Sequence, residues 1–403
     1  MGWIINIYIM VKGEIEMNYK DFEKQLIEWR HHFHMHPETA FEETNTSSYL
    51  AKLLEDMGLE VHRNIGGTGI VANLKVGDGE EIIGIRTDID ALNLTELGEH
   101  PYTSLNKGKM HGCGHDGHIS MILGAVKLLS ERKNFNGIVR FIFQPAEEPG
   151  KGAYKMIEDG LFEKFPMNEI YGIHNKPGMS AGSISTRVGG IMGSEDNFVI
   201  RIKGQGSHAS SPHMGKDPIV IASEIVLALQ TIISRNMDPN VPAVISCTEF
   251  ITDGIHNAIP TNVVIKGDTR SYTPEVQKLL EERMRTISEG ICQINGAECQ
   301  FEYTHEFAPT VNSEKCINNA VKAAINVVGE ENVNGNCQAC MVSEDFGVFL
   351  QRIPGCLVFI GNGDESDEVG NIPLHNSCYD FNDNILKIGA EYFAELIKLR
   401  LPK

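Results

Sequence analysis

The chain is organised around the nine residues Met110-His111-Gly112-Cys113-Gly114-His115-Asp116-Gly117-His118. Three histidines, a cysteine and an aspartate are separated here by three glycines. Cys113 and His115 stand two positions apart, so in an extended or turn segment both side chains can lie on one side. Glycine lets the backbone turn tightly and lets a ligand approach closely. The stretch therefore predicts a tight loop that holds a metal ion.

A helix is predicted directly after this loop, starting near His118. The apolar residues that follow recur at helical spacing and are Ile119, Met121, Ile122, Ala125, Val126, Leu128 and Leu129. Metal and anion sites are commonly built where a loop opens a helix. A polar, glycine-rich turn with surface histidines is the simpler alternative, and the rest of the chain weighs against it.

Length and composition predict a two-domain globular protein. A chain of 403 residues is too long for one ordinary core, and its 41% apolar and 22% charged residues are typical of globular proteins. The net charge is −19 and no run of Lys or Arg occurs, so we expect neither nucleic acid nor a membrane as partner. Nine cysteines without framework spacing indicate a reducing compartment, and we expect a cytoplasmic protein.

The N-terminal region is not expected to bind the metal. Residues 1–16 carry a short apolar run without a basic start, so we expect an N-terminal extension before a true start at Met17. Four histidines flank the end of the first expected helix without forming a convergent face: His31, His32, His34 and His36. Surface positions, or support for nearby metal ligands, are the expected roles of these histidines.

Three apolar strands run into groups that could bind metal or move protons. The first leads to Asp88, the second to Glu147 and Glu148, and the third to His174. In α/β sheets, ligands bind beyond the carboxyl ends of the strands. Because three successive strands would deliver such groups to one edge, the sequence predicts an active site there.

The order of the predicted elements indicates an α/β fold with an inserted second domain. The outer segments alternate strands and helices, which predicts a central mixed sheet flanked by helices. Between them, the order βαββαβ predicts a compact antiparallel sheet backed by two helices. The expected organisation is a discontinuous catalytic domain over 17–190 and 306–403, with an inserted α+β domain over 191–305.

The side chains with metal-ligand chemistry are Cys113, His115, Glu148, His174 and His375. If a thiolate and a water both bridge, these side chains complete two four-coordinate divalent ions. Mixed nitrogen, oxygen and sulfur ligands fit zinc first, with manganese, cobalt or nickel as alternatives. Paired ions can activate a water and polarise a carbonyl in the same step. One carboxylate of the glutamate pair is then left for proton transfer, and the spacing does not say which.

The ordered set of motifs resembles the aminoacylase and carboxypeptidase family of dinuclear metallohydrolases. Within that family, the most similar branch contains the hippurate hydrolases, N-acyl-amino-acid amidohydrolases and plant auxin-conjugate hydrolases. The resemblance extends from about Trp29 to the C-terminus. It rests on His34-x-His36-Pro37-Glu38, Arg86-Thr87-Asp88-Ile89-Asp90-Ala91-Leu92, the 110–118 stretch, Phe143-Gln144-Pro145-Ala146-Glu147-Glu148, Gly172-Ile173-His174, Ser207-His208-Ala209, Ser343-Glu344-Asp345-Phe346 and Leu374-His375-Asn376.

This resemblance implies a zinc-peptidase-like catalytic domain whose five candidate ligands hold two divalent ions. It implies that Glu147 is the general base and Glu148 a ligand, and that Asp88 orients a metal-binding histidine. The wider family has a metal-binding histidine where Arg86 stands, so the Cys113 thiolate would compensate for its absence.

The inserted segment would be the family's lid and dimerisation domain, which implies a homodimer or homotetramer. His208 would reach over to stabilise the oxyanion of the tetrahedral intermediate. Asn262 and Arg270 would contact the substrate, Arg270 through a carboxylate. The plain alternatives are a turn residue at Asn262 and a surface ion pair at Arg270.

The implied reaction is hydrolysis of the amide of an N-acyl or N-aroyl amino acid, such as hippurate, by a metal-activated water. A dipeptidase or an N-acetyl-diaminopimelate deacetylase of the same family is an alternative. A cysteine amidase would use Cys113 as nucleophile and His115 as base, but the glutamate pair and the remote histidines would have no role. A binding protein without turnover is a third alternative, although no expected group is missing.

Overall fold

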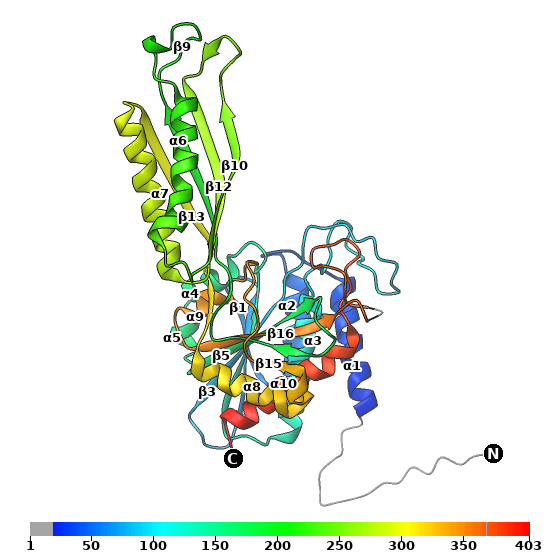
Figure 1. Cartoon of the computed structure of the whole chain (residues 1–403). Helices are drawn as coiled ribbons and strands as arrows, with labels where there is room; N and C mark the ends of the chain where they lie inside the picture. The colour runs from blue at the N-terminus through cyan, green and yellow to red at the C-terminus, as the bar shows by residue number, and fades with distance from the viewer. Residues whose placement is uncertain (1–18, 368) are drawn as a thin grey trace, which may run out of the picture.

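The computed structural model describes residues 19–367 and 369–403, so the expected extension over 1–16 lies outside the described residues. Figure 1 shows an α/β part that contains both ends of the described chain, and an elongated part that rises from it. The elongated part is formed by the middle of the chain, as the predicted insertion requires.

An eight-stranded mixed sheet lies at the centre of the α/β part, in the order β1-β2-β4-β3-β5-β16-β6-β15. Strands β4, β3, β5 and β16 are parallel neighbours, whereas β1, β2 and β4 pair antiparallel. This confirms the predicted central mixed sheet. The strands are β1 (Glu60–Ile65), β2 (Gly69–Val76), β3 (Ile82–Asp88), β4 (Gly137–Gln144), β5 (Glu169–Pro177), β6 (Ile184–Ser185), β15 (Val333–Asn334) and β16 (Gly355–Gly363).

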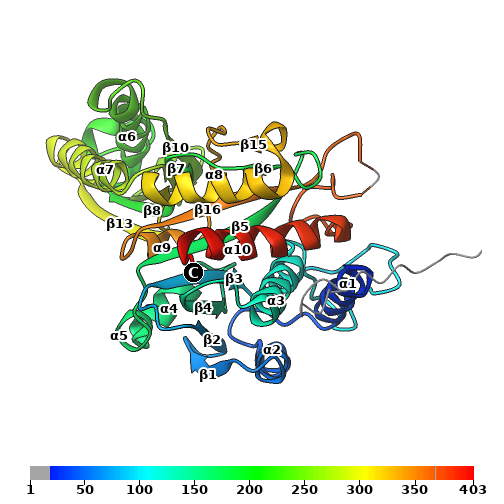
Figure 2. The ribbon, with the colours of Figure 1, turned by 90° about the horizontal axis from the view of Figure 1, so that it is seen from below.

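Helices cover both faces of this sheet. One face packs against α1 (Tyr19–Met35), α2 (Thr44–Asp56), α3 (His115–Arg132), α8 (Glu314–Val328) and α10 (Leu386–Arg400). Figure 2 shows α3, α10 and α8 side by side across it. The other face packs against α4 (Gly152–Glu158), α5 (Leu161–Lys164) and α9 (Phe346–Leu350). Because both faces are buried, the strands appear in the sequence as nearly continuous apolar runs.

Residues 195–307 form a four-stranded antiparallel sheet of their own, in the order β10-β12-β8-β13. Its apolar core lies between the sheet and two helices. The elements are β8 (Glu195–Lys203), α6 (Pro218–Thr231), β10 (Ala243–Thr252), β12 (Asn262–Ser271), α7 (Pro274–Ile294) and β13 (Glu298–Phe307). They follow the predicted order βαββαβ, and we refer to this part as the lid.

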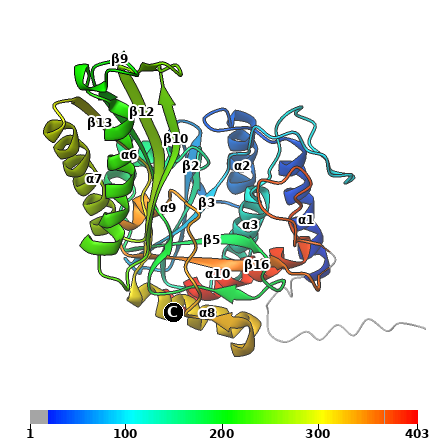
Figure 3. The same ribbon diagram turned by 45° about the horizontal axis from the view of Figure 1, so that its top comes forward.

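The chain passes between the two parts through a pair of short antiparallel strands, β7 (Gly189–Met192) and β14 (Thr310–Asn312). At its far end the lid carries β9 (Ser207–His208), which pairs with β11 (Ala258–Ile259). Figures 1 and 3 both place β9 at the tip of the lid, away from the central sheet.

One helical segment of the lid, Pro218–Asn236, is long and apolar enough to cross a membrane by length and composition, with 33% of it buried. Its inner residues Ile221, Ile225 and Leu229 pack into the lid core. Val220 and Leu227 are exposed. An amphipathic helix on the surface of a lid passes the same test.

Candidate metal centre

The loop before α3 positions Cys113 and His115 of the organising stretch. Gly114 precedes the helix with φ 90° and ψ 16°, a left-handed conformation that glycine adopts without strain. A Cβ here would lie 2.6 Å from Asn175 Oδ1 and 2.7 Å from the Tyr379 hydroxyl. Helix α3 begins at His115, before the predicted start near His118, because the glycine ends the loop earlier than the apolar pattern indicates. His115 and His118, which are three positions apart, therefore lie on one face of the helix.

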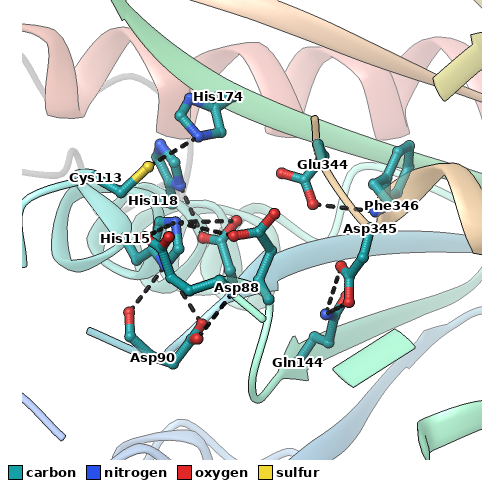
Figure 4. Close-up of polar contacts among 12 residues, drawn as sticks. Asp88, Asp90, Cys113, His115, His118, Gln144, His174, Glu344, Asp345 and Phe346 are labelled. Carbon is teal, nitrogen blue, oxygen red and sulfur yellow. Dashed lines mark hydrogen bonds and ion pairs between the residues drawn. The ribbon is translucent and has the colours of Figure 1, made fainter. Parts of the chain in front are cut away.

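The five candidate ligands lie around one point at the carboxyl edge of the sheet. Cys113, His115 and His174 offer ligand atoms within 4.8 Å of one another, and so do Cys113, Glu148 and His375. Figure 4 shows the first three pointing toward one another. Cys113 Sγ is 3.5 Å from His174 Nε2, and His375 Nε2 is 3.4 Å from Glu148 Oε2. Segments that are distant in the sequence thus contribute to a single cluster.

The donor atoms of this cluster fit a divalent ion. Among the described residues, His115 Nε2 and Glu148 Oε1 are buried without a hydrogen-bond partner. His115 and His174 donate their Nδ1–H groups to the carbonyl oxygens of Asp90, at 2.9 Å, and Asn175, at 2.7 Å. In the neutral rings each Nε2 is then unprotonated and faces the cluster, which is the tautomer that binds a metal.

Cys113 requires a neighbouring cation if it is to act as a ligand. Burial raises the pKa of its thiol well above the ordinary value, and the charge of Glu148 adds to the effect. A thiolate in such surroundings is stable only beside positive charge, which a divalent ion would supply. The same surroundings disfavour the free thiolate that a cysteine amidase would need.

Asp88 lies at the centre of the site, and the histidine to which it is hydrogen-bonded, His118, is not one of the five candidate ligands. Its Oδ1 accepts from His118 Nδ1 at 2.8 Å, whereas its Oδ2 is 3.8 Å from His115 Nε2. His118 Nε2 accepts from the backbone N–H of Asn175 at 3.1 Å. The group that orients His115 is therefore the Asp90 carbonyl, because it alone of the two reaches the Nδ1 side of the ring. No role was predicted for His118, although its three-residue spacing from His115 indicates that both lie on one helix face.

Arg86, which stands where the wider family has a metal-binding histidine, is fully engaged by other groups. Its buried guanidinium donates to Asp88 at 2.9 Å, Glu344 at 2.8 Å, Asp345 at 3.0 Å and Gln144 at 2.8 Å. It therefore holds Asp88 together with Glu344 and Asp345, and Figure 4 shows the last two on the side of the site away from Cys113. Glu344 and Asp345 were predicted only as part of a motif, since Arg86 is remote from them in the chain.

Glu147 lies beside the ligand cluster without completing it. Its Oε2 is 3.9 Å from His115 Nε2, and Glu148 Oε1 is 4.0 Å from the same atom. Burial raises the pKa of the Glu147 carboxyl well above its usual range, and the charges of Glu344 and Glu148 reinforce the effect. A carboxylate with a raised pKa at this position is suited to accept a proton and return it.

A pocket of about 820 Å³ opens in front of the cluster. The candidate ligands Cys113, Glu148, His174 and His375 and the candidate base Glu147 form one wall. The opposite walls are largely apolar and include Met192, Phe307, Val342, Phe359 and Leu374, with Lys176 and Arg270 as the basic side chains. A mostly apolar pocket with a few polar groups is typical of a binding site for a small organic molecule.

The three predicted lid residues lie in different places. Arg270 lines the pocket, where it pairs with Glu195 at 2.9 Å and with Asp268 at 3.0 Å. Asn262 is exposed at the start of β12 and does not belong to the described pocket lining. His208 is exposed at the tip of the lid (Figure 1) and is also outside that lining. Of these three residues, the raised lid thus brings only Arg270 to the pocket.

Buried nitrogen, sulfur and carboxylate donors, a glutamate beside them and an apolar pocket in front are what a metal-dependent hydrolase requires. The class defined by the fold and the site is therefore that of the metallohydrolases with an α/β catalytic core. Comparison with known proteins then identifies the family.

The model of peptidase family M20/M25/M40 matches residues 84–399. The chain is 40% identical over 376 residues to a hippurate hydrolase of Campylobacter jejuni. The matched region covers 93% of this chain and 96% of that hydrolase. It is 35% identical over 381 residues to an N-acetylcysteine deacetylase of Bacillus subtilis, with 94% and 97% covered. A solved dinuclear metal-binding peptidase of the M20 family from Bacillus subtilis matches with a TM-score of 0.82 at 32% identity, over 95% and 99% of the two chains.

The chain belongs to peptidase family M20/M25/M40. This confirms the resemblance to the amidohydrolase branch, and with it the expected α/β fold carrying an inserted α+β part. The protein is accordingly a metal-dependent hydrolase that acts on amide bonds.

Proposed function

We propose that this enzyme hydrolyses the amide of N-acyl or N-aroyl amino acids such as hippurate. Cys113, His115, Glu148, His174 and His375 would hold two divalent ions, zinc first, with manganese, cobalt or nickel as alternatives. The observation that carries the proposal is their convergence. Two of their ligand atoms, His115 Nε2 and Glu148 Oε1, are buried and have no hydrogen-bond partner among the described residues. The similarity to a hippurate hydrolase and to an N-acetylcysteine deacetylase supports the substrate class. The similarity to a solved dinuclear metal-binding peptidase supports a pair of ions.

When bound, the ions would polarise the amide carbonyl and lower the pKa of a water to about 7. Glu147 would accept the proton of the attacking water on its carboxylate and return it to the leaving nitrogen. Its burial beside Glu344 makes its carboxylate a stronger base than a solvated one. Phe307 and Phe359 would exclude bulk water from the pocket around the reacting amide.

We propose that residues 191–305 act as the lid and dimerisation domain. In this proposal His208 stabilises the oxyanion, so a lid movement or the lid of a second copy has to bring it to the pocket. Arg270 would contact the substrate from the pocket wall, and Asn262 would approach it only on closure.

A homodimer or homotetramer assembled through the lid is part of this proposal. Strand β10 forms an edge of the lid sheet and exposes Phe250 and Ile251 at 45% and 46%. Val220 and Leu227 are exposed on the neighbouring α6. Apolar side chains on a free sheet edge favour association with a second chain. Light scattering on the purified protein would measure the oligomeric state.

We also place the enzyme in the cytoplasm. All nine cysteines are free thiols, including the pocket-lining Cys113 and Cys340. A reducing compartment preserves such thiols and keeps Cys113 able to bind a metal.

Exhaustive chelation is the experiment that tests the metal-dependent reaction. Hydrolysis of hippurate should be lost on chelation and return with zinc, manganese or cobalt, because the ions would lower the pKa of the attacking water and polarise the amide carbonyl. Activity that survives complete removal of metal would overturn the proposal. A panel of hippurate, N-acetyl-amino acids, an indole-acetyl conjugate and a dipeptide would then rank the substrate classes. Inactivation of the metal-free protein by thiol alkylation, with an acyl-enzyme intermediate, would favour the cysteine amidase instead.

A further inference from the structure

Lys176 projects from the same strand face as a candidate metal ligand. It stands two residues beyond His174 on β5, and both residues line the pocket. Side chains at positions i and i+2 of a strand point to the same face. Phe359 of the neighbouring strand β16 is the register partner of His174. Lys176 Nζ lies 4.6 Å from the centre of the Phe359 ring, so the ammonium group is held against the pocket wall.

The charge of Lys176 is not balanced by a carboxylate. In the described ranges 19–367 and 369–403, the pocket wall has two basic side chains, Lys176 and Arg270. Arg270 already pairs with Glu195 at 2.9 Å and Asp268 at 3.0 Å and donates to Ser343 Oγ at 2.7 Å. Lys176, by contrast, lies against the Phe359 ring and close enough to Cys340 to act on its thiol, and it makes no ion pair with any described residue.

We propose that Lys176 binds a carboxylate group of the substrate, an inference that rests on the proposed amidohydrolase function. A substrate carboxylate would gain a charge-assisted hydrogen bond to Lys176 without displacing an existing partner. At Arg270 the same carboxylate would have to compete with Glu195 and Asp268. Lys176 is thereby a specificity-determining residue of the pocket.

The position of Lys176 suits a carboxylate close to the scissile bond. Residues two apart on a strand are separated by about 7 Å. This spacing matches a scissile carbonyl at the His174 side of the pocket and a carboxylate a few bonds further along the substrate. An N-acyl amino acid carries such a group on its amino acid half, and a dicarboxylic acyl chain carries one on its acyl half.

Steady-state kinetics of the metal-loaded enzyme with Lys176→Met and Lys176→Arg test the inference. The substrates are hippurate and N-acetylleucine, which carry only the α-carboxylate, and N-succinylleucine, which has a second carboxylate on the acyl half. Lys176→Met should raise KM by about tenfold or more and change kcat by less than about threefold, because a charge-assisted contact is lost. Lys176→Arg should retain most of the affinity. Lys75→Met, at an exposed position of β2, is the matched control and should behave as wild type.

The substrates distinguish the two sources of the carboxylate. An equal rise of KM on hippurate and N-acetylleucine assigns the α-carboxylate, and a rise confined to N-succinylleucine assigns the acyl half. Both results support the inference, provided metal content and circular dichroism match wild type. An unchanged KM on every substrate would overturn it while leaving the proposed function intact. Failure of the metal-loaded wild type on all three would overturn the proposed function, and this inference with it.

Discussion

Glu147 and Glu148 are adjacent in the chain but have different surroundings. The backbone N–H of Glu148 donates to Asp90 Oδ2 at 3.1 Å, and its Oε2 is 3.4 Å from His375 Nε2. Glu147 instead lies against the buried carboxylates that Arg86 gathers. The contacts of the two side chains support the roles implied by the resemblance, with Glu148 at the ions and Glu147 free to move a proton.

Glu147→Gln should leave the metal content unchanged and lower kcat by about 10²–10⁴, the usual contribution of a general base. The amide keeps the shape of the side chain but cannot accept the proton of the water. Elemental analysis and hippurate turnover, measured on the same preparation, check both expectations. Glu80→Gln, on an exposed loop, is the control. Full turnover by the Glu147 variant would show that another group is the base.

At the scale of elements, the loop that carries Cys113 and His115 is tied to α1 by buried charges. Asp116, at the start of α3, lies 3.0 Å from Arg30 Nε and 2.8 Å from His34 Nδ1. His34 Nε2 also lies 3.0 Å from Glu96 in the following loop. Two members of this group, Arg30 and His34, come from α1. Of the four N-terminal histidines, His34 therefore supports the loop that carries Cys113.

The stability of the protein should depend on pH through His34. Burial alone would lower the pKa of His34, but Asp116 and Glu96 outweigh it and raise the pKa to about 9, from 6.5. Since the folded state binds this proton more tightly than the unfolded state, the contribution is complete below pH 6.5 and is lost as pH rises toward 9. Each unit of the shift corresponds to about 1.4 kcal/mol.

Urea unfolding of wild type and His34→Gln across pH 6 to 9.5 would measure this contribution. The free-energy difference between the two proteins should shrink steadily as pH rises through the window. His213→Gln, at an exposed lid position, should run parallel to wild type and serves as the control. A constant difference across the range would mean that His34 is not protonated in the folded protein.

For the whole molecule, the raised lid keeps two proposed substrate-binding residues away from the pocket. His208 and Asn262 lie on the lid outside the described pocket lining. Arg270, near the end of β12, lines the pocket. The pair β7–β14 is the narrow connection through which the lid could move. Catalysis with His208 thus requires either closure about this connection or a second chain.

His208→Ala should lower kcat by about 10²–10³, the effect of removing one oxyanion donor, with little change in metal content. A mixture of His208→Ala and Glu147→Gln proteins, exchanged through gentle dissociation, separates the two routes. Recovery of activity in the mixture would show that a partner chain supplies the histidine, and no recovery would favour closure within one chain. His256→Ala, also on the lid, is the control. Wild-type turnover by the His208 variant would remove this residue from the mechanism.

The sequence by itself determined the helices and strands, the βαββαβ insertion and the chemical types of the candidate ligands. These features are local, because periodic apolar spacing and glycine-rich turns depend on neighbours along the chain. Element ends shifted where one residue overrode the pattern, as Gly114 did for the start of α3. The convergence of strand ends could also be predicted, since parallel neighbours share one edge.

The tertiary structure alone decided how the side chains pair. In the folded chain Asp88 is hydrogen-bonded to His118, and the Asp90 carbonyl orients His115. Lys176 lies against an aromatic ring and pairs with no described carboxylate. The tertiary structure also placed His208 far from the pocket. Such partners are distant in the chain and are selected by packing, burial and the position of the lid, so no spacing in the sequence encodes them.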